Sequence, residues 1–301
     1  MFVIGTGRSG TSIMHELLAL DPRSRTPATW ELLHPGDLSS PRGLGADAAR
    51  TLGHQVHAFW ADVQPAYESM HHNHGDEPNE CIIATMLEFL SDQWGGTYEV
   101  PTYSAHLVSV DHTDAYRYHR RVLQTLQHRE RADRWVLKAP SHLAQLRSLF
   151  AVYPDARIVQ IHRDPLKTVP STISLMGTIR SMRCAEVDVD SLVGLVSLGY
   201  GFMLDAVIDD RASGALPDGQ FVDVRYADLL ADPVATIATA YDQLSLPFDD
   251  ALGTAILDHL AARPKDRLGP HRYTLEDTGL DVTAERARFQ RYQQHYAVPD
   301  E

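Results

Sequence analysis

The apolar positions of this chain fall into two patterns. Short, nearly continuous apolar runs predict buried strands at residues 2–4, 135–137, 156–161 and 221–224. Longer stretches with apolar residues at every third or fourth position predict helices, namely at residues 11–20, 47–63, 78–94, 113–130, 142–153, 166–182, 190–210, 233–245, 249–262 and 282–296. Strands and helices that alternate in this way predict parallel strands joined by right-handed crossovers. The pattern therefore indicates a single α/β domain over residues 1–301, with a central, mainly parallel sheet and a helical insertion at about 47–130.

Composition and charge narrow the classes of function. The chain is 44% hydrophobic and 22% charged, as globular proteins are, and its net charge is −13 with His neutral. This acidity argues against a general nucleic-acid binder, which needs a cationic surface to neutralise phosphates. Cys81 and Cys184 form no spacing motif and suggest a reducing compartment. We expect a cytoplasmic protein, because the sequence contains no obvious membrane-spanning stretch and no signal peptide.

The first predicted strand leads into a glycine-rich turn. Residues 5–12 read Gly-Thr-Gly-Arg-Ser-Gly-Thr-Ser and continue directly into a predicted helix. A turn of this kind aims backbone N–H groups and a helix N-terminus at one anion. The spacing nearly matches the phosphate loop of nucleotide triphosphatases, but Thr11 stands where that loop has its lysine, and the basic residue is Arg8. The alternative is an ordinary strand-to-helix turn whose glycines only allow tight packing.

Two further predicted strands end in basic residues. Arg163 follows a buried strand and Ser171 lies about two helical turns further on, so both side chains could reach one phosphate group. Lys138 follows another strand and would point into the same crevice as the glycine turn. The alternatives are an arginine that pairs with Asp164 and a lysine that is solvated beside its strand. Three cationic strand ends in one chain favour an anion site.

These motifs together resemble those of the PAPS-dependent sulfotransferases. The resemblance rests on the turn at residues 5–12, on Lys138-Ala139-Pro140 and on the pair Arg163 and Ser171. The neighbourhoods shared with the bacterial branch of that family are Trp30-Glu31, Asn79-Glu80-Cys81, Trp135-Val136-Leu137-Lys138 and His271-Arg272-Tyr273. The resemblance implies a P-loop-type three-layer fold and in-line transfer of a sulfuryl group from 3′-phosphoadenosine-5′-phosphosulfate (PAPS) to an acceptor hydroxyl. The product would be adenosine 3′,5′-bisphosphate (PAP), and no metal is expected.

The resemblance also assigns roles to residues. The donor-binding positions would be Gly7, Arg8, Ser9, Gly10, Thr11 and Ser12 at the 5′-phosphosulfate, Arg163 and Ser171 at the 3′-phosphate, and Tyr226, Arg267 and Gly269 nearby. Lys138 and Arg8 would stabilise the charge that grows on the oxygen bridging to the departing phosphate. Glu31 matches the position of the general base in related enzymes, with His142 as the second candidate. A structural alternative for Glu31 is a helix-terminal charge or a salt bridge to Arg8.

The acceptor is predicted only as a class. A small-molecule or lipid-like hydroxyl fits an aromatic lining from the insertion, for which the candidates are Tyr67, His72, Phe89, Trp94 and Tyr103. The histidine-rich run at residues 71–77 has no standard metal spacing and predicts a polar loop on the acceptor side. Two rival functions stay open: a P-loop kinase with an altered loop, and a non-catalytic nucleotide-binding protein on the same fold.

The beginning of the chain departs from the family pattern. The bacterial relatives usually have a helical segment before the first strand, and here the sequence begins on that strand. We expect the strand's edge to lack a cover, for which three explanations are open: a trimmed form, a short member of the family, or a homo-oligomer that covers the edge.

Overall fold

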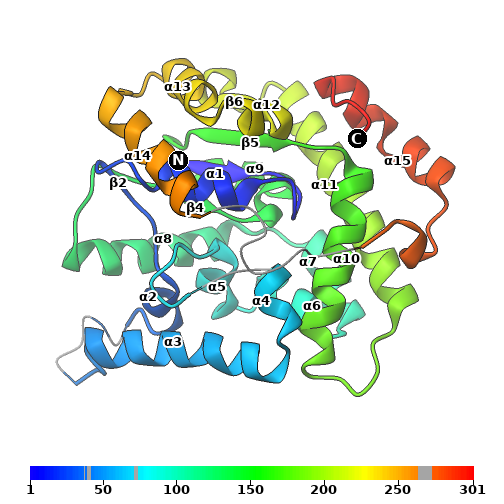
Figure 1. Cartoon of the computed structure of the whole chain (residues 1–301), viewed down its shortest axis with the longest axis horizontal. Coiled ribbons are helices and arrows are strands. Elements are labelled where there is room, and N and C mark those ends of the chain that lie inside the picture. The colour runs from blue at the N-terminus through cyan, green and yellow to red at the C-terminus, as the bar shows by residue number, and fades with distance from the viewer. Residues whose placement is uncertain (37, 39–41, 71–73, 264–272) are drawn as a thin grey trace.

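A four-stranded parallel sheet lies at the centre of the computed structural model (Figure 1). The structure describes residues 1–36, 38, 42–70, 74–263 and 273–301. The strands are β1 (Phe2–Ile4), β4 (Leu137–Lys138), β5 (Ile158–His162) and β6 (Phe221–Arg225), in the order β4-β1-β5-β6. All three pairings are parallel, so the predicted sheet type is confirmed.

The first strand is an inner strand of this sheet. β1 pairs with β4 on one side and with β5 on the other, and the Met1 amino group donates a hydrogen bond of 2.7 Å to the Trp135 carbonyl. The expectation of an uncovered edge at the start of the chain was therefore wrong. The position of β1 therefore gives no reason to expect a homo-oligomer.

Helices make up most of the remaining chain. Their bounds are α1 (Thr11–Leu18), α2 (Thr29–Leu33), α3 (Ala46–Val63), α4 (Ala66–Met70), α5 (Cys81–Met86), α6 (Asp92–Thr97), α7 (Pro101–Ser109), α8 (Thr113–Arg129), α9 (Leu146–Val152), α10 (Pro165–Ser181), α11 (Val189–Ala212), α12 (Tyr226–Ala231), α13 (Pro233–Gln243), α14 (Asp250–Ala262) and α15 (Val282–Tyr296). Short 3₁₀ turns are η1 (Pro140–Ala144), η2 (Asp218–Gln220) and η3 (Glu276–Thr278), and a separate two-stranded pair joins β2 (Ser24–Arg25) to β3 (Arg134–Trp135).

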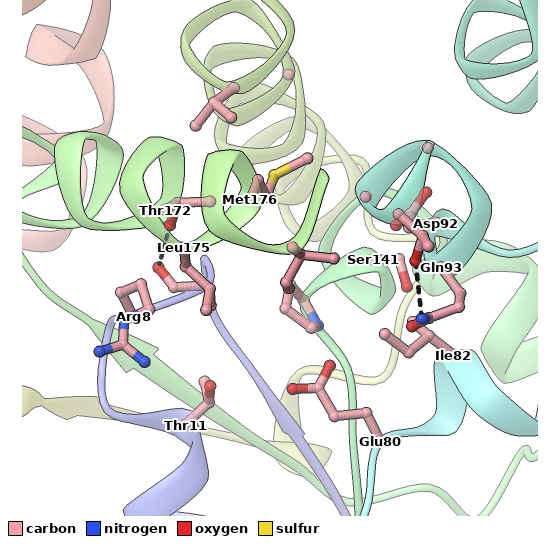
Figure 2. Close-up of a pocket in the computed structure, with 18 of the residues that line it drawn as sticks. Arg8, Thr11, Glu80, Ile82, Asp92, Gln93, Ser141, Thr172, Leu175 and Met176 are labelled. Carbon is pink, nitrogen blue, oxygen red and sulfur yellow. Dashed lines mark hydrogen bonds between the residues drawn. The ribbon is translucent and has the colours of Figure 1, made fainter. Parts of the chain in front are cut away.

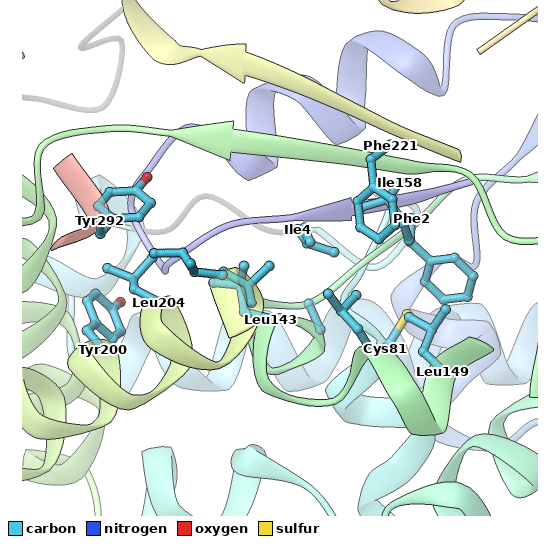
Figure 3. Packing of buried hydrophobic residues seen from close by; sticks show 14 of the residues in the cluster. Phe2, Ile4, Cys81, Leu143, Leu149, Ile158, Tyr200, Leu204, Phe221 and Tyr292 are labelled. Carbon is cyan, nitrogen blue, oxygen red and sulfur yellow. The ribbon is translucent and has the colours of Figure 1, made fainter. Parts of the chain in front are cut away.

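Helices cover both faces of the sheet, and the alternation of side chains along each strand decides which cluster a residue joins. Phe2 and Ile4 point into a cluster with residues of η1, α9, α10, α11 and α15, shown in part in Figure 3. Val3 points the other way, into a cluster with residues of α1, α12, α13 and α14. The three layers are those of an α/β fold, and α3 to α8, the helices of the segment that was predicted to be an insertion, lie beside them (Figure 1).

One predicted helix is wrong. Residues 78–94 form no continuous helix: α5 ends at Met86, α6 begins at Asp92, and Phe89 between them has a φ of 54°. Ser91 starts the second helix, because its hydroxyl accepts a hydrogen bond from the Gln93 amide at 3.3 Å. Leu87, which contributed to the helical periodicity, is exposed, and so is Phe89.

Helix α11 is long and apolar enough, by length and composition, to cross a membrane. The sequence expectation of no such stretch therefore does not hold for this helix. One side of it packs in the core, where Leu192, Val196, Tyr200 and Leu204 are all buried. These contacts with the sheet layer are those of a core helix.

Candidate active site

A cavity of about 690 Å³ lies between the carboxyl ends of the strands and the helical insertion. Its described lining comes from the glycine turn, from the segments after β4, β5 and β6, and from α2 to α7, α10 and α11. Figure 2 shows Arg8 and Thr11 at one end, Asp92, Gln93 and Ser141 at the other, and Glu80 between them. Parallel α/β sheets place their ligands at this edge.

The glycine turn has a conformation that needs glycine. Gly10 has a φ of 100°, and a Cβ at this position would lie 2.3 Å from the Tyr226 ring. Gly10 is also the N-cap of α1 and makes no side-chain capping hydrogen bond. The first backbone amides of α1 thus receive no hydrogen bond from a side chain at position 10. These amides are suited to bind an anion.

Ser9 does not take the place predicted for it. Its hydroxyl donates to the Thr6 carbonyl at 2.7 Å and its amide donates to the same oxygen at 3.2 Å, so the residue closes the turn on itself. Ser9 is completely buried. The neighbouring predicted residues Gly7, Gly10, Thr11 and Ser12 do line the cavity.

Arg8 joins the turn to two other segments. Its Nε donates to Ser171 Oγ at 3.1 Å, and its Nη1 donates to the Met70 carbonyl at 2.8 Å at the end of α4. The backbone of Arg8 has a φ of 68°, a conformation that is uncommon outside glycine. Burial lowers the pKa of this guanidinium, although Tyr273 and Tyr200 oppose the effect. Arg8 still lines the cavity as a cation.

Arg163 lies beside Arg8 rather than directly on Ser171. Its Nη1 donates to the Arg8 carbonyl at 3.2 Å, its Nε donates to a Glu301 carboxylate oxygen at 3.1 Å, and its guanidinium stacks on the Tyr226 ring at 4.4 Å. The alternative pairing with Asp164 is not observed, because that carboxylate caps α10 and pairs with Arg286.

Lys138 connects the sheet to the insertion. Its ammonium donates to Ser12 Oγ at 3.1 Å and forms an ion pair with Glu80. The Lys138 side chain is only 4% exposed, so a counter-ion is needed to hold its charge here. Asn79 fixes the approach of Glu80: its Oδ1 accepts the Glu80 amide at 2.6 Å, and its Nδ2 donates to Thr29 Oγ1 at 2.7 Å.

Glu31 does not reach this cavity. Its carboxylate accepts hydrogen bonds from Arg25 at 2.5 Å and from the Ala28 amide at 2.9 Å, which closes the start of α2. The described lining of the cavity does not include Glu31. The structure therefore gives this residue the structural role of a capping carboxylate, with Arg25 as its partner rather than Arg8.

His142 is also absent from the described lining. It is buried beneath the cavity, where its Nδ1 shares a 2.6 Å hydrogen bond with the Tyr116 hydroxyl and its ring packs edge-on against Phe2. Burial, with a smaller effect of His119, lowers the pKa of His142 to about 3. This geometry supports neither of the two sequence candidates as the general base.

The structure brings most of the predicted donor residues together. The members that line the cavity are Gly7, Arg8, Gly10, Thr11, Ser12, Lys138, Arg163, Ser171 and Tyr226. Arg267, Gly269 and His72 lie outside the described residues. On the acceptor side Tyr67 lines the cavity, whereas Phe89, Trp94 and Tyr103 are not among its described lining residues.

Sequence reasoning missed the carboxylates of the cavity, Glu80 and Asp92. Glu80 stands in the segment Asn79-Glu80-Cys81, which was part of the family resemblance but had no role assigned to it. That segment could have directed attention to Glu80. Among the described residues, no group of three His, Cys, Asp or Glu side chains could hold a metal ion.

Comparison with known proteins decides the family. A profile of the sulfotransferase family matches residues 1–250. The chain belongs to the sulfotransferase family. It is thus an enzyme that transfers a sulfuryl group, and the kinase and non-catalytic alternatives are set aside.

Several proteins that it resembles come from mycobacteria. The chain is 24% identical over 285 residues to the omega-hydroxy-beta-dihydromenaquinone-9 sulfotransferase Stf3 of Mycobacterium bovis and Mycobacterium tuberculosis, covering 93% of this chain and 71% of that protein. The crystal structure of sulfotransferase STF1 from Mycobacterium tuberculosis H37Rv superposes with a TM-score of 0.79 at 29% identity, over 96% of this chain and 75% of that one. That of STF9 from Mycobacterium avium gives a TM-score of 0.82 at 26% identity, over 99% and 77%.

Proposed function

We propose that this sulfotransferase takes its sulfuryl group from PAPS and transfers it to the hydroxyl of an apolar, lipid-like acceptor. The observation that carries the proposal is the convergence of Arg8, Lys138 and Arg163 on one cavity, beside the start of α1. A donor with phosphate groups at two positions needs separated cations, and this arrangement supplies them.

The donor's two ends would have different partners. The amides after Gly10, the hydroxyls of Thr11 and Ser12, and the Lys138 ammonium suit the 5′-phosphosulfate. Arg163 suits the 3′-phosphate, because a planar guanidinium can donate two parallel hydrogen bonds to it. Ser171 would contact the same phosphate, while its Oγ accepts the hydrogen bond that holds Arg8 in place.

The bound donor supplies the sulfuryl group, and PAP is the leaving group. Glu80 is the carboxylate that we assign as general base, since it lines the cavity beside Lys138 and can accept the proton of the acceptor hydroxyl. Lys138 is held between Ser12 and Glu80, where its charge can stabilise the oxygen that bridges to the departing phosphate. Positioning and charge stabilisation carry most of such a loose, in-line transfer.

The acceptor side supports a lipid-like alcohol. Its described lining is largely aliphatic and aromatic, with members Val56, Trp60, Ile82, Ile83, Met86, Leu107, Val110, Leu175, Met176, Ile179, Val196 and Met203. Burial of apolar surface in such a cavity favours an apolar skeleton around the reacting hydroxyl. The Stf3 relatives are named for a menaquinone derivative, which is consistent with this class.

Free Cys81 and Cys184 agree with a cytoplasmic location.

Calorimetric titration tests the donor. We expect PAP to bind with micromolar affinity without a metal ion, and ATP with Mg²⁺ to bind at least about tenfold more weakly. Arg163→Ala should weaken PAP binding by about 10- to 150-fold, because a charge-assisted hydrogen bond contributes about 1.5–3 kcal/mol. Millimolar or absent PAP binding to the wild-type protein would overturn the proposal.

A further inference from the structure

We propose that the acceptor carries a second hydroxyl group, at the end of its apolar skeleton opposite the hydroxyl that is sulfated. This inference rests on the proposed function and specifies its substrate class. The second hydroxyl would bind at the polar end of the cavity, formed by Asp92, Gln93 and Ser141 (Figure 2). A diol of this kind differs in chemistry from a simple apolar alcohol.

Asp92 is the centre of this polar end. Its exposed surface faces the cavity, and the Ser141 hydroxyl is its hydrogen-bond partner. None of the ion pairs between described residues includes Asp92. Burial raises the pKa of this carboxyl, and Glu80 adds to the effect, whereas His112 and Ser141 oppose it. A carboxyl held away from bulk water and short of partners has hydrogen-bonding capacity for a ligand.

Asp92 lies in the first turn of α6, where a carboxylate suits the helix N-terminus, but it is not the residue that caps the helix. The side chain that caps α6 is that of Ser91, which accepts the Gln93 amide. The Gln93 side chain is itself held in place, because its Nε2 donates to Thr97 Oγ1 at 3.0 Å. A leucine at position 92 would leave these bonds intact and would suit the apolar wall better. The carboxyl takes no part in these bonds and lines the cavity, where it can contact an occupant.

His112 is a second sign of unmatched polarity at this end. It lines the cavity and is buried, and its Nε2 donates to the Leu107 carbonyl at 2.8 Å. That bond leaves Nδ1 as an acceptor in the neutral ring, and among the described residues it has no hydrogen-bond partner. Buried polar atoms are seldom left unpaired. A hydroxyl brought in by the acceptor would add a donor to this region.

Apolar side chains line the cavity around these polar groups. Leu175 and Met176 lie above the space that separates Arg8 from Asp92 in Figure 2, and Ile82 lies at the Asp92 side. Ile82 is the apolar neighbour on the Glu80 side of Asp92, so an occupant that contacts both carboxylates needs an apolar body with two polar groups.

A hydroxyl is the group that fits Asp92 in both of its protonation states. It donates to the carboxylate and accepts from the carboxylic acid, and Ser141 and Gln93 can offer either role as well. A carbonyl could only accept, and an apolar end would leave the carboxyl unpaired. The geometry thus favours a diol over a keto-alcohol or a mono-ol.

Binding of matched alcohols to the PAP-saturated protein tests the inference. The probes are decanol and the decanediol with a hydroxyl at each end, and the rigid pair androstanol and androstanediol, with binding followed by the fluorescence of Trp60 in the cavity wall. For at least one pair, the wild-type protein should bind the diol about tenfold or more tightly than the mono-ol. Asp92→Leu should abolish or reverse this preference, while Asp114→Asn, an exposed carboxylate change on α8, should preserve it.

Each outcome has a defined meaning. Equal affinity for mono-ol and diol, or no binding of any probe, overturns the inference, as does a diol preference that survives Asp92→Leu. PAP titration of each variant shows whether it is folded, and Asp92→Asn serves if the leucine variant binds no PAP. Loss of PAP binding in the wild-type protein would instead contradict the proposed function, so the two failures are distinguishable.

Discussion

Replacement of Glu80 by glutamine separates catalysis from donor binding. In the wild-type protein, the carboxylate pairs with Lys138, whose side chain is 4% exposed, while that of Glu80 is 16% exposed. Glu80→Gln keeps the size of the side chain and one oxygen that can accept from Lys138. It removes the negative charge and the ability to accept a proton.

The expected changes have opposite signs for turnover and affinity. Loss of a general base lowers kcat by about 10²- to 10⁴-fold. Removal of one partner from a buried ion pair costs about 3–5 kcal/mol, and the partial exposure of Glu80 with the retained hydrogen bond reduces this to about 2–3 kcal/mol. An anionic donor can replace the missing counter-ion. If binding of PAP restores about 1.4 kcal/mol of this lost stability, PAP binds about tenfold more tightly to the variant than to the wild type.

The assay measures PAP affinity by calorimetry, stability by urea unfolding with and without PAP, and PAP release from PAPS with an acceptor that the wild type sulfates. Glu31→Gln is the matched control, because Glu31 is also a buried carboxylate in an ion pair, with Arg25 at 2.5 Å. It should lower stability and leave kcat and PAP affinity within about threefold of wild type. The reasoning is refuted if Glu80→Gln keeps kcat within about tenfold, or if Glu31→Gln removes turnover instead.

Three further changes probe the donor end and the core. Glu301→Gln removes the partner of Arg163 from a partly exposed ion pair, which contributes about 0.2–1 kcal/mol, so PAP should bind about 1.5- to 5-fold more tightly by titration; weaker binding would contradict this. Gly10→Ala introduces a Cβ that lies 2.3 Å from the Tyr226 ring, at a residue whose φ is 100°, and should lower both Tm and PAP affinity. Tyr226→Ala in the same chain should relieve the clash, and an unchanged Tm of Gly10→Ala would contradict the prediction. Burial lowers the pKa of His142 to about 3 from 6.5, so its contribution to stability is complete above pH 6.5 and is lost as the pH falls toward 3, by about 1.4 kcal/mol per unit. His142→Phe should make urea unfolding less pH-dependent between pH 6 and 4 by this amount, and an unchanged slope would show that the ring is protonated in the folded state.

The sequence carried enough information to bring most of the predicted donor residues together. Strands β1, β5 and β6 are short apolar runs that lie close to the predicted residues, and the glycine turn follows the first of them. Parallel pairing brings the carboxyl ends of these strands together, so residues far apart in sequence meet at one edge. Arg8, Lys138 and Arg163 could be placed together because Lys138 ends a strand, Arg163 directly follows one, and Arg8 lies in the glycine turn after β1.

The acceptor half could not be predicted in the same way. The periodicity at 78–94 indicated one helix, but α5 ends at Met86, Leu87 and Phe89 are exposed, and a second helix begins after Ser91. Periodicity records which residues are apolar, and does not record whether a partner surface covers them. Glu31 shows the same limit for charges: a glutamate at the expected distance from the turn pairs with Arg25, six residues before it in the chain.

Glu80 belongs to the insertion, so the assigned base and the donor-binding residues come from different parts of the fold. Asn79 anchors it to Thr29, and Glu80 in turn contacts Lys138 of the sheet, so the assigned base sits where the two halves of the site meet. A base on the sheet would have a fixed position relative to the donor whatever the acceptor. A base at the start of α5 instead moves with the wall that contacts the acceptor. Changes in α5 to α7 can therefore alter acceptor choice and the alignment of the reacting hydroxyl together, while the strand ends keep the donor in place.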